Sequence, residues 1–352
     1  FGPDLDLTRS LQVQRARSEA ADSAPGLSTV LRSEDLRDLP LSGRDLYAAI
    51  VTQPSVTADA GTGRGLGVSV AGLRPSVSNY LLDGVENNNH LLTGPLVSVP
   101  PEAIGEYRLT LNNYSAEYGR GAGFLANAVT QSGSPDAWHG LLWANFKHDS
   151  LNANSFARNR AGLPRAELAE SQTGFRAGGP LRGKVLQGSI ALERLSNRGE
   201  SDPQDVVLPT SLFEQFTAPN SLARRLLREF PAPAFSAGNL PVGRTTLTPP
   251  AGLTRWFSLA RLDYSPAKSK MKWYGRYLLN RLTRPDFIWT PYPDFRSPLT
   301  QETDSAALGL QHALRPTLVY EARVAWSRDS IGWDRARADV PTLFEGLAGT
   351  IL

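Results

Sequence analysis

The sequence predicts a mixed fold: a small α/β domain followed by antiparallel strands with the pattern of a transmembrane β-barrel, incomplete in this chain. Up to about residue 135, short helical and strand patterns alternate and are interrupted by Gly, Asn and Pro. From Trp138 onward, apolar and polar residues alternate one by one. The alternating runs are about 9 to 11 residues long, which is the length of a strand that crosses a bilayer at a tilt.

The first half contains one clear helical pattern and several short strands. A helix is predicted over residues 43–53, because Ser42 precedes it as a cap, an acid follows three residues later, and Pro54 ends it. Leu46 and Ile50 fall on one face of this helix, which we expect to be buried. The predicted strands are the runs GVSVAG, NYLLDG, EYRLTL and FLANAVTQ.

The second half is dominated by runs with a period of two residues. The clearest run extends from Thr317 to Ser327, and one of its faces is entirely apolar: Leu318, Tyr320, Ala322, Val324 and Trp326. Comparable alternation covers residues 185–192, 256–264 and 271–279. Each run is therefore predicted to be a strand with one apolar and one polar face.

This alternation fits two architectures. In a soluble sandwich, the apolar face points into a dry core. In an outer-membrane barrel, the apolar face meets lipid and the polar face lines a wet lumen. Periodicity alone does not separate them. Strand length favours the barrel, as do the aromatic residues near strand ends: Trp256, Tyr264, Tyr320 and Trp326. Short turns also alternate with long loops, such as the proline-rich segment between Leu195 and Leu253, in which SLARRLLREF has a helical pattern.

Composition excludes several classes of protein. The chain has 352 residues, of which 41% are apolar and 20% charged, so it is neither disordered nor a helical membrane protein. No run of roughly 18 apolar residues occurs. The net charge of +3 is mild and the arginines are dispersed, so no nucleic-acid partner is predicted. The absence of cysteine excludes disulfides and thiolate metal sites.

No motif for catalysis or metal binding is present. The four histidines, at positions 90, 139, 148 and 312, share no ligand spacing. The run GTGRGLG at residues 61–67 lacks the Lys-Ser/Thr ending of a phosphate loop and opens no helix. Neither a Gly-x-Ser-x-Gly elbow nor a His-Glu-x-x-His motif occurs. We therefore predict no catalytic residue, no metal and no cofactor, and hence a protein that is not an enzyme.

Three motifs carry a resemblance to a known family. In chain order they are VSVAGLRPSVSNYLLDGVENN, VPPEAIGEYRLT and YSAEYGRGAGFLANAVTQSG. Their order and spacing resemble those of the plug domain of TonB-dependent outer-membrane receptors. The runs LPLSGRDL, NNYSAEYGR, WHG and TGFRAGGPL are similar to the Oar-like branch of that family. The chain departs from the family pattern at Ala71, at Asn112-Asn113 and at Phe124.

The resemblance implies a division of the chain into three parts. Residues 1–28 would be an N-terminal segment leading into the plug, residues 29–135 the plug domain, and residues 136–352 the first part of the transmembrane β-barrel. Receptors of this family close with about 22 strands, whereas the last part has room for about 8 to 10. We therefore expect a fragment of a longer receptor that lies in the bacterial outer membrane.

The resemblance also implies which plug residues contact the ligand and which contact the barrel. Three plug loops, residues 55–67, 74–79 and 86–98, should face outward. The candidate ligand-binding residues on them are Arg64, Arg74, Asn87, Asn88, Asn89 and His90. Asn side chains both donate and accept hydrogen bonds, which suits a sugar or a peptide. Glu117 and Arg120 are candidates for plug–barrel contacts. The alternative for all of these is an ordinary polar loop tip or a solvated turn.

Two functions remain open from the sequence. The first is uptake of a scarce, unknown small solute, a sugar or peptide, through a plugged barrel, with TonB engaging the N-terminal segment and outer-membrane lipid surrounding the strands. The run LQVQRA at residues 11–16 is only weakly similar to the TonB-contacting box. The second is a non-transporting surface protein of the same architecture, acting in adhesion or matrix assembly.

Overall fold

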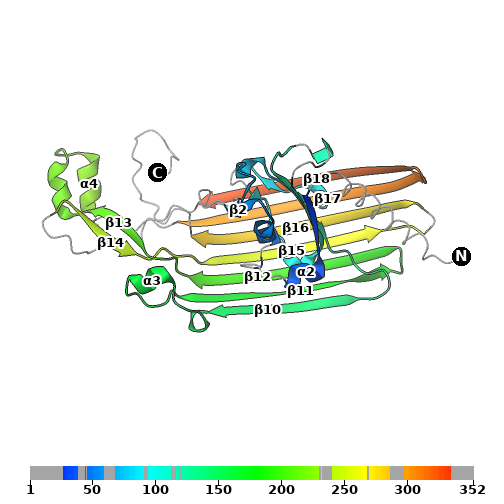
Figure 1. The fold of residues 1–352 in the computed structure, drawn as a ribbon, viewed down its shortest axis with the longest axis horizontal. Helices are drawn as coiled ribbons and strands as arrows, with labels where there is room; N and C mark the ends of the chain where they lie inside the picture. Colours follow the sequence, from blue (N-terminus) through cyan, green and yellow to red (C-terminus); the bar gives the residue numbers. More distant parts are fainter. Residues whose placement is uncertain are drawn as a thin grey trace.

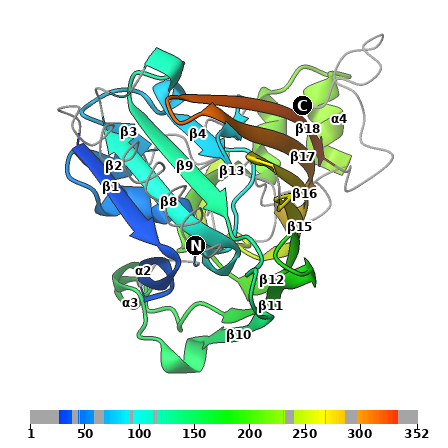
Figure 2. The same cartoon turned by 90° about the vertical axis from the view of Figure 1, so that its right-hand side faces the viewer.

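The computed structural model describes two principal sheets, one lying against the other. A five-stranded sheet has the order β1-β8-β9-β4-β5, and a seven-stranded sheet the order β10-β11-β12-β15-β16-β17-β18. Figures 1 and 2 show the smaller sheet and its helices on the concave side of the larger one. The described residues are 27–38, 44, 46–58, 68–90, 94–111, 114, 116–118, 120–229, 231, 240–267, 269–285 and 297–333.

The N-terminal domain holds the smaller sheet and short connecting elements. Its strands are β1 (Leu27–Arg32), β2 (Val56–Ala58), β3 (Val68–Val70), β4 (Asn79–Leu82), β5 (Val85–Glu86), β6 (Asn88–Asn89), β7 (Gly94–Pro95), β8 (Ile104–Leu111) and β9 (Phe124–Thr130). Its helices are α2 (Ser33–Asp38) and the 3-10 helices η2 (Leu46–Thr52), η4 (Pro75–Val77), η5 (Pro101–Ala103) and η6 (Ala116–Tyr118). Strand β9 pairs antiparallel with β8 and parallel with β4, so the sheet is mixed.

The helix predicted over residues 43–53 is a 3-10 helix, η2, rather than an α-helix. Ser42, the predicted cap, lies outside the described residues. The burial was predicted correctly, since Leu46 and Ile50 are fully buried. A 3-10 helix aligns residues three apart, so Leu46 and Ala49 share a face, whereas Ile50 is buried by the surrounding packing and not by a shared helical face.

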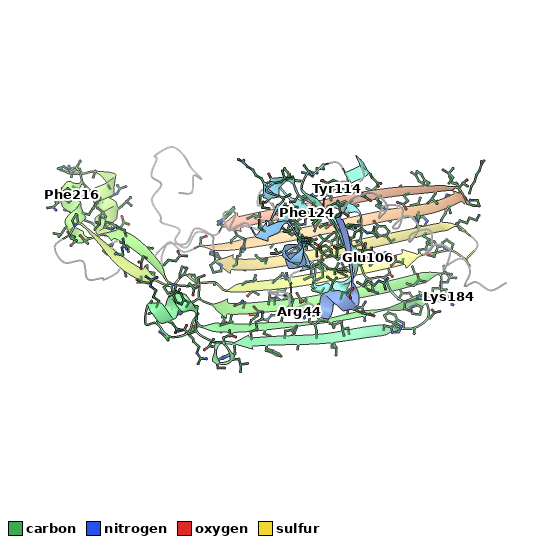
Figure 3. The ribbon with its side chains drawn as sticks, in the orientation of Figure 1. Arg44, Glu106, Tyr114, Phe124, Lys184 and Phe216 are labelled. Atoms are coloured by element: carbon green, nitrogen blue, oxygen red, sulfur yellow. The ribbon has the colours of Figure 1, made fainter. Side chains whose placement is uncertain are left out.

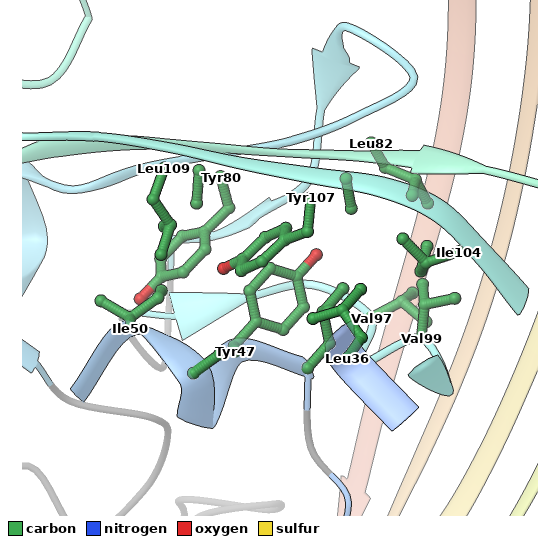
Figure 4. Close-up of a cluster of buried hydrophobic side chains, with 14 of the residues drawn as sticks. Leu36, Tyr47, Ile50, Tyr80, Leu82, Val97, Val99, Ile104, Tyr107 and Leu109 are labelled. Atoms are coloured by element: carbon green, nitrogen blue, oxygen red, sulfur yellow. The ribbon is translucent and has the colours of Figure 1, made fainter. Parts of the chain in front are cut away.

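Aromatic side chains form the centre of the N-terminal domain (Figure 4). Tyr47 of η2 meets Tyr80 and Tyr107 edge-to-face, with ring centroids 5.2 and 5.8 Å apart, and Tyr80 meets Phe124 in the same way at 5.2 Å. Such T-shaped pairs add about 0.5–1.5 kcal/mol each beyond the area that they bury. These contacts join η2 to β4, β8 and β9, so the domain has a core of its own.

The seven-stranded sheet is antiparallel throughout. Its strands are β10 (His139–His148), β11 (Leu168–Arg182), β12 (Leu186–Gly199), β15 (Leu253–Tyr264), β16 (Met271–Pro285), β17 (Pro298–Arg315) and β18 (Leu318–Trp333). At 10 to 18 residues, most are longer than the predicted 9 to 11. The apolar alternation marks only part of each strand, and the backbone pairing continues beyond it into more polar sequence.

The two faces of this sheet differ in burial as the alternation predicts. The outer face is exposed and largely apolar, and it includes Leu142, Phe146, Ile190, Leu262, Tyr277, Leu308, Tyr320, Val324 and Trp326. The inner face, against the N-terminal domain, is buried and mixed: it combines Ala191, Phe257, Leu259 and Leu278 with Glu193, Arg255, Arg276 and Asn280. A soluble sandwich would bury the apolar face, so the observed burial pattern is the one expected of a barrel wall.

The two ends of the sheet carry connections of different length. At one end, marked by Lys184 in Figure 3, tight turns join β11 to β12, β15 to β16 and β17 to β18. At the other end lie the longer connections, with η7 (Asp149–Leu151), α3 (Phe156–Arg160), β13 (Gln204–Pro209), η8 (Ser211–Phe216), α4 (Leu222–Glu229) and β14 (Val242–Leu247). Helix α4 is the helix predicted from SLARRLLREF.

Within the described part of the chain, no helix combines the length and the apolar character needed to cross a membrane.

Candidate functional site

The tight turn between β4 and β5 places a carboxylate at the contact between the two sheets. Asp83 and Gly84 both have positive φ, at 55° and 73°, and Leu82 pairs with Val85 across them. This is the backbone of a two-residue hairpin, for which Asp-Gly is a preferred sequence. Thr130 of β9 donates to Asp83 Oδ1 from its backbone N at 2.8 Å and from its hydroxyl at 3.0 Å. The carboxylate is thereby fixed within the N-terminal domain.

Two arginines of the large sheet reach this carboxylate. Arg261 Nη1 of β15 lies 3.1 Å from Asp83 Oδ1 and also donates to the Thr130 carbonyl at 3.0 Å. Arg276 Nε of β16 lies 3.0 Å from Oδ2, as an ion pair without hydrogen-bond alignment. Between them, the Tyr274 hydroxyl donates to the Asp83 carbonyl at 3.0 Å. The side chains of Asp83 and Arg276 are only 3% and 1% exposed, so the charges are desolvated together.

A second line of contacts follows strand β18. A Cβ added at Gly84 would lie 3.1 Å from the Arg323 guanidinium, so the turn sits directly under that side chain. Further along the strand, Asn89 Nδ2 lies 3.3 Å from Asp329 Oδ2. Asp329 also accepts from Thr303 at 2.6 Å and from Gln301 at 3.0 Å. The N-terminal domain thus contacts the inner face of the sheet at two positions along β18, near Arg323 and near Asp329.

The segment after β9 also attaches the N-terminal domain to the large sheet, at strand β12. The hydroxyl of Ser189, on β12, donates to the Gln131 carbonyl at 2.7 Å. Beyond it, a cavity of about 510 Å³ lies between the segment from Gln131 to Pro135 and strands β10 and β11, and His139 and Arg176 are among its lining residues. The contact is therefore close near β12 to β18 and more open near β10 and β11.

The predicted ligand-binding residues occupy different environments. Arg74 and His90 are exposed, Asn88 is half-buried, and Asn87 and Asn89 are buried. Asn87 donates to the Tyr47 hydroxyl at 2.8 Å and to the Val97 carbonyl at 3.1 Å, so it ties two segments of the domain together. Arg64 lies outside the described residues. Periodicity could not separate the buried asparagines from the half-buried one, because residues 87–90 are four polar residues in a row.

Arg120, predicted to contact the barrel, pairs with residues of the N-terminal domain itself. Its guanidinium pairs with Glu86 and lies 2.9 Å from Nδ1 of His90, and Glu86 also lies 3.0 Å from Nε2 of His90. All three side chains are about half exposed or more. Glu117 is exposed on η6. The sequence did not reveal this cluster, since Arg120 lies 30 residues after His90.

A small polar hollow adjoins this cluster. It has a volume of about 60 Å³ and is lined by Pro75, Ser76, Ser78, Tyr80, Asn88, Asn89, His90 and Gly94. Its side chains are mainly hydroxyl and amide groups, which bind neutral polar groups in both donor and acceptor roles. Two of the predicted loops, residues 74–79 and 86–98, therefore meet in space.

Among the described residues, no group of three His, Cys, Asp or Glu side chains is placed to hold a metal ion.

Comparisons with known proteins agree with this arrangement. Residues 20–124 match the family model of the TonB-dependent receptor plug domain. The chain carries a TonB-dependent receptor plug. The plug is thus the N-terminal domain described above, and the seven-stranded sheet corresponds to part of the receptor barrel, which confirms the predicted fold class. The match also indicates the bacterial outer membrane, as predicted.

A curated relative extends the match to the predicted branch. The TonB-dependent transporter Oar of Myxococcus xanthus is 31% identical over 85 residues, which are 24% of this chain and 8% of the relative.

Solved structures resemble the chain over most of its length. The outer membrane transporter YddB of Escherichia coli has a TM-score of 0.60 at 12% identity, covering 85% of this chain and 38% of that one. The ferric yersiniabactin uptake receptor FyuA of Yersinia pestis has a TM-score of 0.57 at 14% identity, covering 89% and 42%. At these identities the likeness shows the fold alone. The chain spans about two fifths of the length of these structures.

The sequence missed the residues that dock the plug. Asp83 lies in the first of the three motifs, where Asp-Gly follows the run NYLL. A preference of Asp-Gly for tight turns was sufficient to explain it, so no contact with the barrel was predicted. Arg261 and Arg276 appeared only as polar residues on alternating strands. A usable signal was their position: both are charged residues in the middle of otherwise apolar runs, on the face predicted to line the lumen.

Proposed function

We propose that the protein is the gated part of an outer-membrane receptor that admits a small solute when TonB moves the plug. The observation that carries this proposal is the docking of the plug through the buried Asp83 carboxylate against Arg261 and Arg276. A buried ion pair is specific in geometry and contributes little net stability, because desolvation offsets most of its Coulomb energy. Such a contact holds the plug in one position and can be broken once water enters.

The solute would first meet the outward surface of the plug. We assign Arg74, Asn88 and His90 to this surface because Arg74 and His90 are exposed and Asn88 is half-buried, and Arg64 belongs to a neighbouring loop in the sequence. Glu86 and Arg120 neutralise each other beside the polar hollow. This surface therefore favours a neutral ligand rich in hydroxyl or amide groups, such as a sugar or a peptide. Asn89 joins the surface to the barrel through Asp329, so ligand contact and plug docking share one segment.

Energy would enter through the N-terminal segment, residues 1–28. Most of that segment, including the run LQVQRA, lies outside the described residues. The relative from Myxococcus xanthus is itself named a TonB-dependent transporter, which supports transport over the alternative of a surface protein that only adheres.

Uptake measured with and without TonB tests this proposal. Cells with the intact gene and cells with the gene deleted would be supplied with radiolabelled oligosaccharides and oligopeptides, each in a background with and without functional TonB. We expect a label that accumulates only when both the gene and TonB are present. If no label in the panel depends on either factor, the non-transporting surface protein becomes the better account.

A further inference from the structure

The outer face of the large sheet changes character at a fixed distance from the tight turns. In β18, the apolar side chains Leu318, Tyr320, Val324 and Trp326 are followed by Arg328, which is exposed on the same face. In β12, Ile190 and Leu192 are followed by Arg194 and then Arg198, both exposed. In β16, the first charged residue on this face is Arg281.

The distance fits the thickness of a membrane. The apolar stretch covers about eight to ten residues in each strand, or roughly 26–33 Å along it. With a strand tilt of about 40°, this corresponds to about 20–25 Å across the membrane, close to the apolar band of outer-membrane barrels. The arginines therefore lie where the hydrocarbon ends and lipid headgroups begin, on the side of the long connections.

These arginines differ in whether they have a partner. Arg281 is paired with Asp304 at 3.0 Å. Arg194, Arg198 and Arg328 form no ion pair with any carboxylate among the residues that the structure describes. The guanidinium of Arg194 instead lies over the ring of Trp256, 5.3 Å from its centroid. These three exposed cations without an ion-pair partner, one of them on an interfacial tryptophan, form what we call the arginine girdle: Arg194, Arg198, Arg328 and Trp256.

We propose that the arginine girdle binds the phosphate of lipid headgroups in the outer leaflet. A guanidinium matches the geometry of phosphate and forms two charge-assisted hydrogen bonds with it. Tryptophan prefers this depth, because its ring is apolar and its N–H is polar. The exposed apolar residues below the girdle, such as Ile190 and Leu262, would contact the acyl chains of the same lipid. This inference depends on the membrane orientation of the sheet and not on the transport proposal.

Lipids that differ only in phosphate test the proposal. The full chain, purified in dodecyl maltoside micelles, would be titrated with dioleoyl phosphatidic acid, with dioleoyl glycerol, or with inorganic phosphate, and bound lipid would be counted by native mass spectrometry. We expect phosphatidic acid to bind at least about tenfold more tightly than dioleoyl glycerol, which is the equivalent of one charge-assisted hydrogen bond. Raising the salt concentration should weaken only the phosphatidic acid complex.

Variants assign the binding to the girdle. R194Q/R198Q should lose about tenfold or more in affinity for phosphatidic acid. R194K/R198K should bind with an affinity between that of the parent and that of the glutamine variant, because lysine keeps the charge and loses the two-point geometry. The matched control is R160Q/R225Q, which removes two exposed arginines from α3 and α4 and should bind as the parent does. Equal binding of both lipids by the parent chain would overturn the proposal whether or not any variant folds. So would equal losses in both glutamine variants, or binding of inorganic phosphate as tight as that of the lipid.

Discussion

The guanidinium of Arg261 meets a carboxylate 178 residues earlier in the chain: its Nη1 lies 3.1 Å from Oδ1 of Asp83. One residue belongs to the barrel wall and the other to the plug, so this contact records how the two parts fit together. Arg276 completes it from the next strand. Removing the carboxylate takes an ion pair from each of two largely buried arginines, so mutation of Asp83 tests the contact directly.

Asp83→Asn should loosen the plug. The amide keeps the size of the carboxylate and loses its charge, so the buried Arg276 loses its ion pair with Asp83, and Arg261 keeps only its pair with Asp263 at 2.8 Å. We expect a loss of about 3 kcal/mol or more in the free energy of unfolding, seen as a lower melting temperature and faster proteolysis of the plug in detergent. Glu106→Gln, which weakens the more exposed Glu106–Arg108 pair at 3.6 Å, is the control and should cost less than about 1 kcal/mol. Equal effects of the two changes would contradict the docking role.

Asn87→Ala should act on the plug fold rather than on ligand binding alone. It removes a hydrogen bond to the Tyr47 hydroxyl and the two contacts with Val97 in a buried site. We expect a loss of about 2–3 kcal/mol, because buried polar groups are left unpaired. Arg74→Ala, at an exposed position, should change stability by no more than about 0.5 kcal/mol. Thermal unfolding followed by circular dichroism measures both, and an unaltered Asn87 variant would refute the structural role.

Gly121→Ala should disturb the turn before β9. A Cβ at Gly121 would lie 2.5 Å from the Val77 carbonyl oxygen, whereas one at Gly123 would meet its nearest atom, Val77 Cγ2, at 3.3 Å. Backbone atoms cannot move aside as easily as a side-chain methyl. We therefore expect Gly121→Ala to cost about 1–3 kcal/mol and Gly123→Ala clearly less. Denaturant unfolding of the two variants side by side provides the comparison, and the reverse order of stability would count against this packing.

The long connection between β12 and β15 contains an ion pair that should respond to pH, between Glu214 of η8 and Arg228 of α4. Arg228 holds the pKa of Glu214 below its ordinary value, first through a side-chain hydrogen bond, and Arg224 adds to the effect. A lowered folded-state pKa means that the pair stabilises the loop above the ordinary pKa of glutamate and loses this effect as the pH falls through the lowered one. Arg228→Gln should raise the pKa of Glu214 toward its ordinary value in an NMR titration. An unchanged titration midpoint would show that the pair does not form in solution.

The alternating strands were predictable because successive side chains of a strand point to opposite faces of the sheet. Leu318, Tyr320, Val324 and Trp326 fall on one side at period two, and all four are exposed on the outer face of β18. Strand ends were less predictable, because hydrogen-bonded pairing continues after the apolar pattern stops, as it does beyond Arg328. The register between neighbouring strands was not predictable, because the periodicity within one strand does not specify which residues of the next strand it pairs with.

The candidate site was only partly predictable. Loops rich in Asn and Ser were recognised, but burial of Asn87 depends on Tyr47, which lies 40 residues earlier. The docking contact joins Asp83 to Arg261 and Arg276 across slightly more than half the chain, and no local pattern connects them. Sequence motifs predicted local turns, whereas the plug–barrel contact depends on tertiary packing, which these motifs do not specify.

A single engineered thiol measures plug movement most directly. The chain has no cysteine, so Ser189→Cys would place the only one on β12, at a site that the plug segment at Gln131 covers. Cells that produce this receptor would be treated with a water-soluble maleimide, with and without functional TonB. The account predicts faster labelling of residue 189 when TonB is present, because displacement of the plug exposes it. Equal labelling rates in the two backgrounds would contradict the claim that TonB moves the plug.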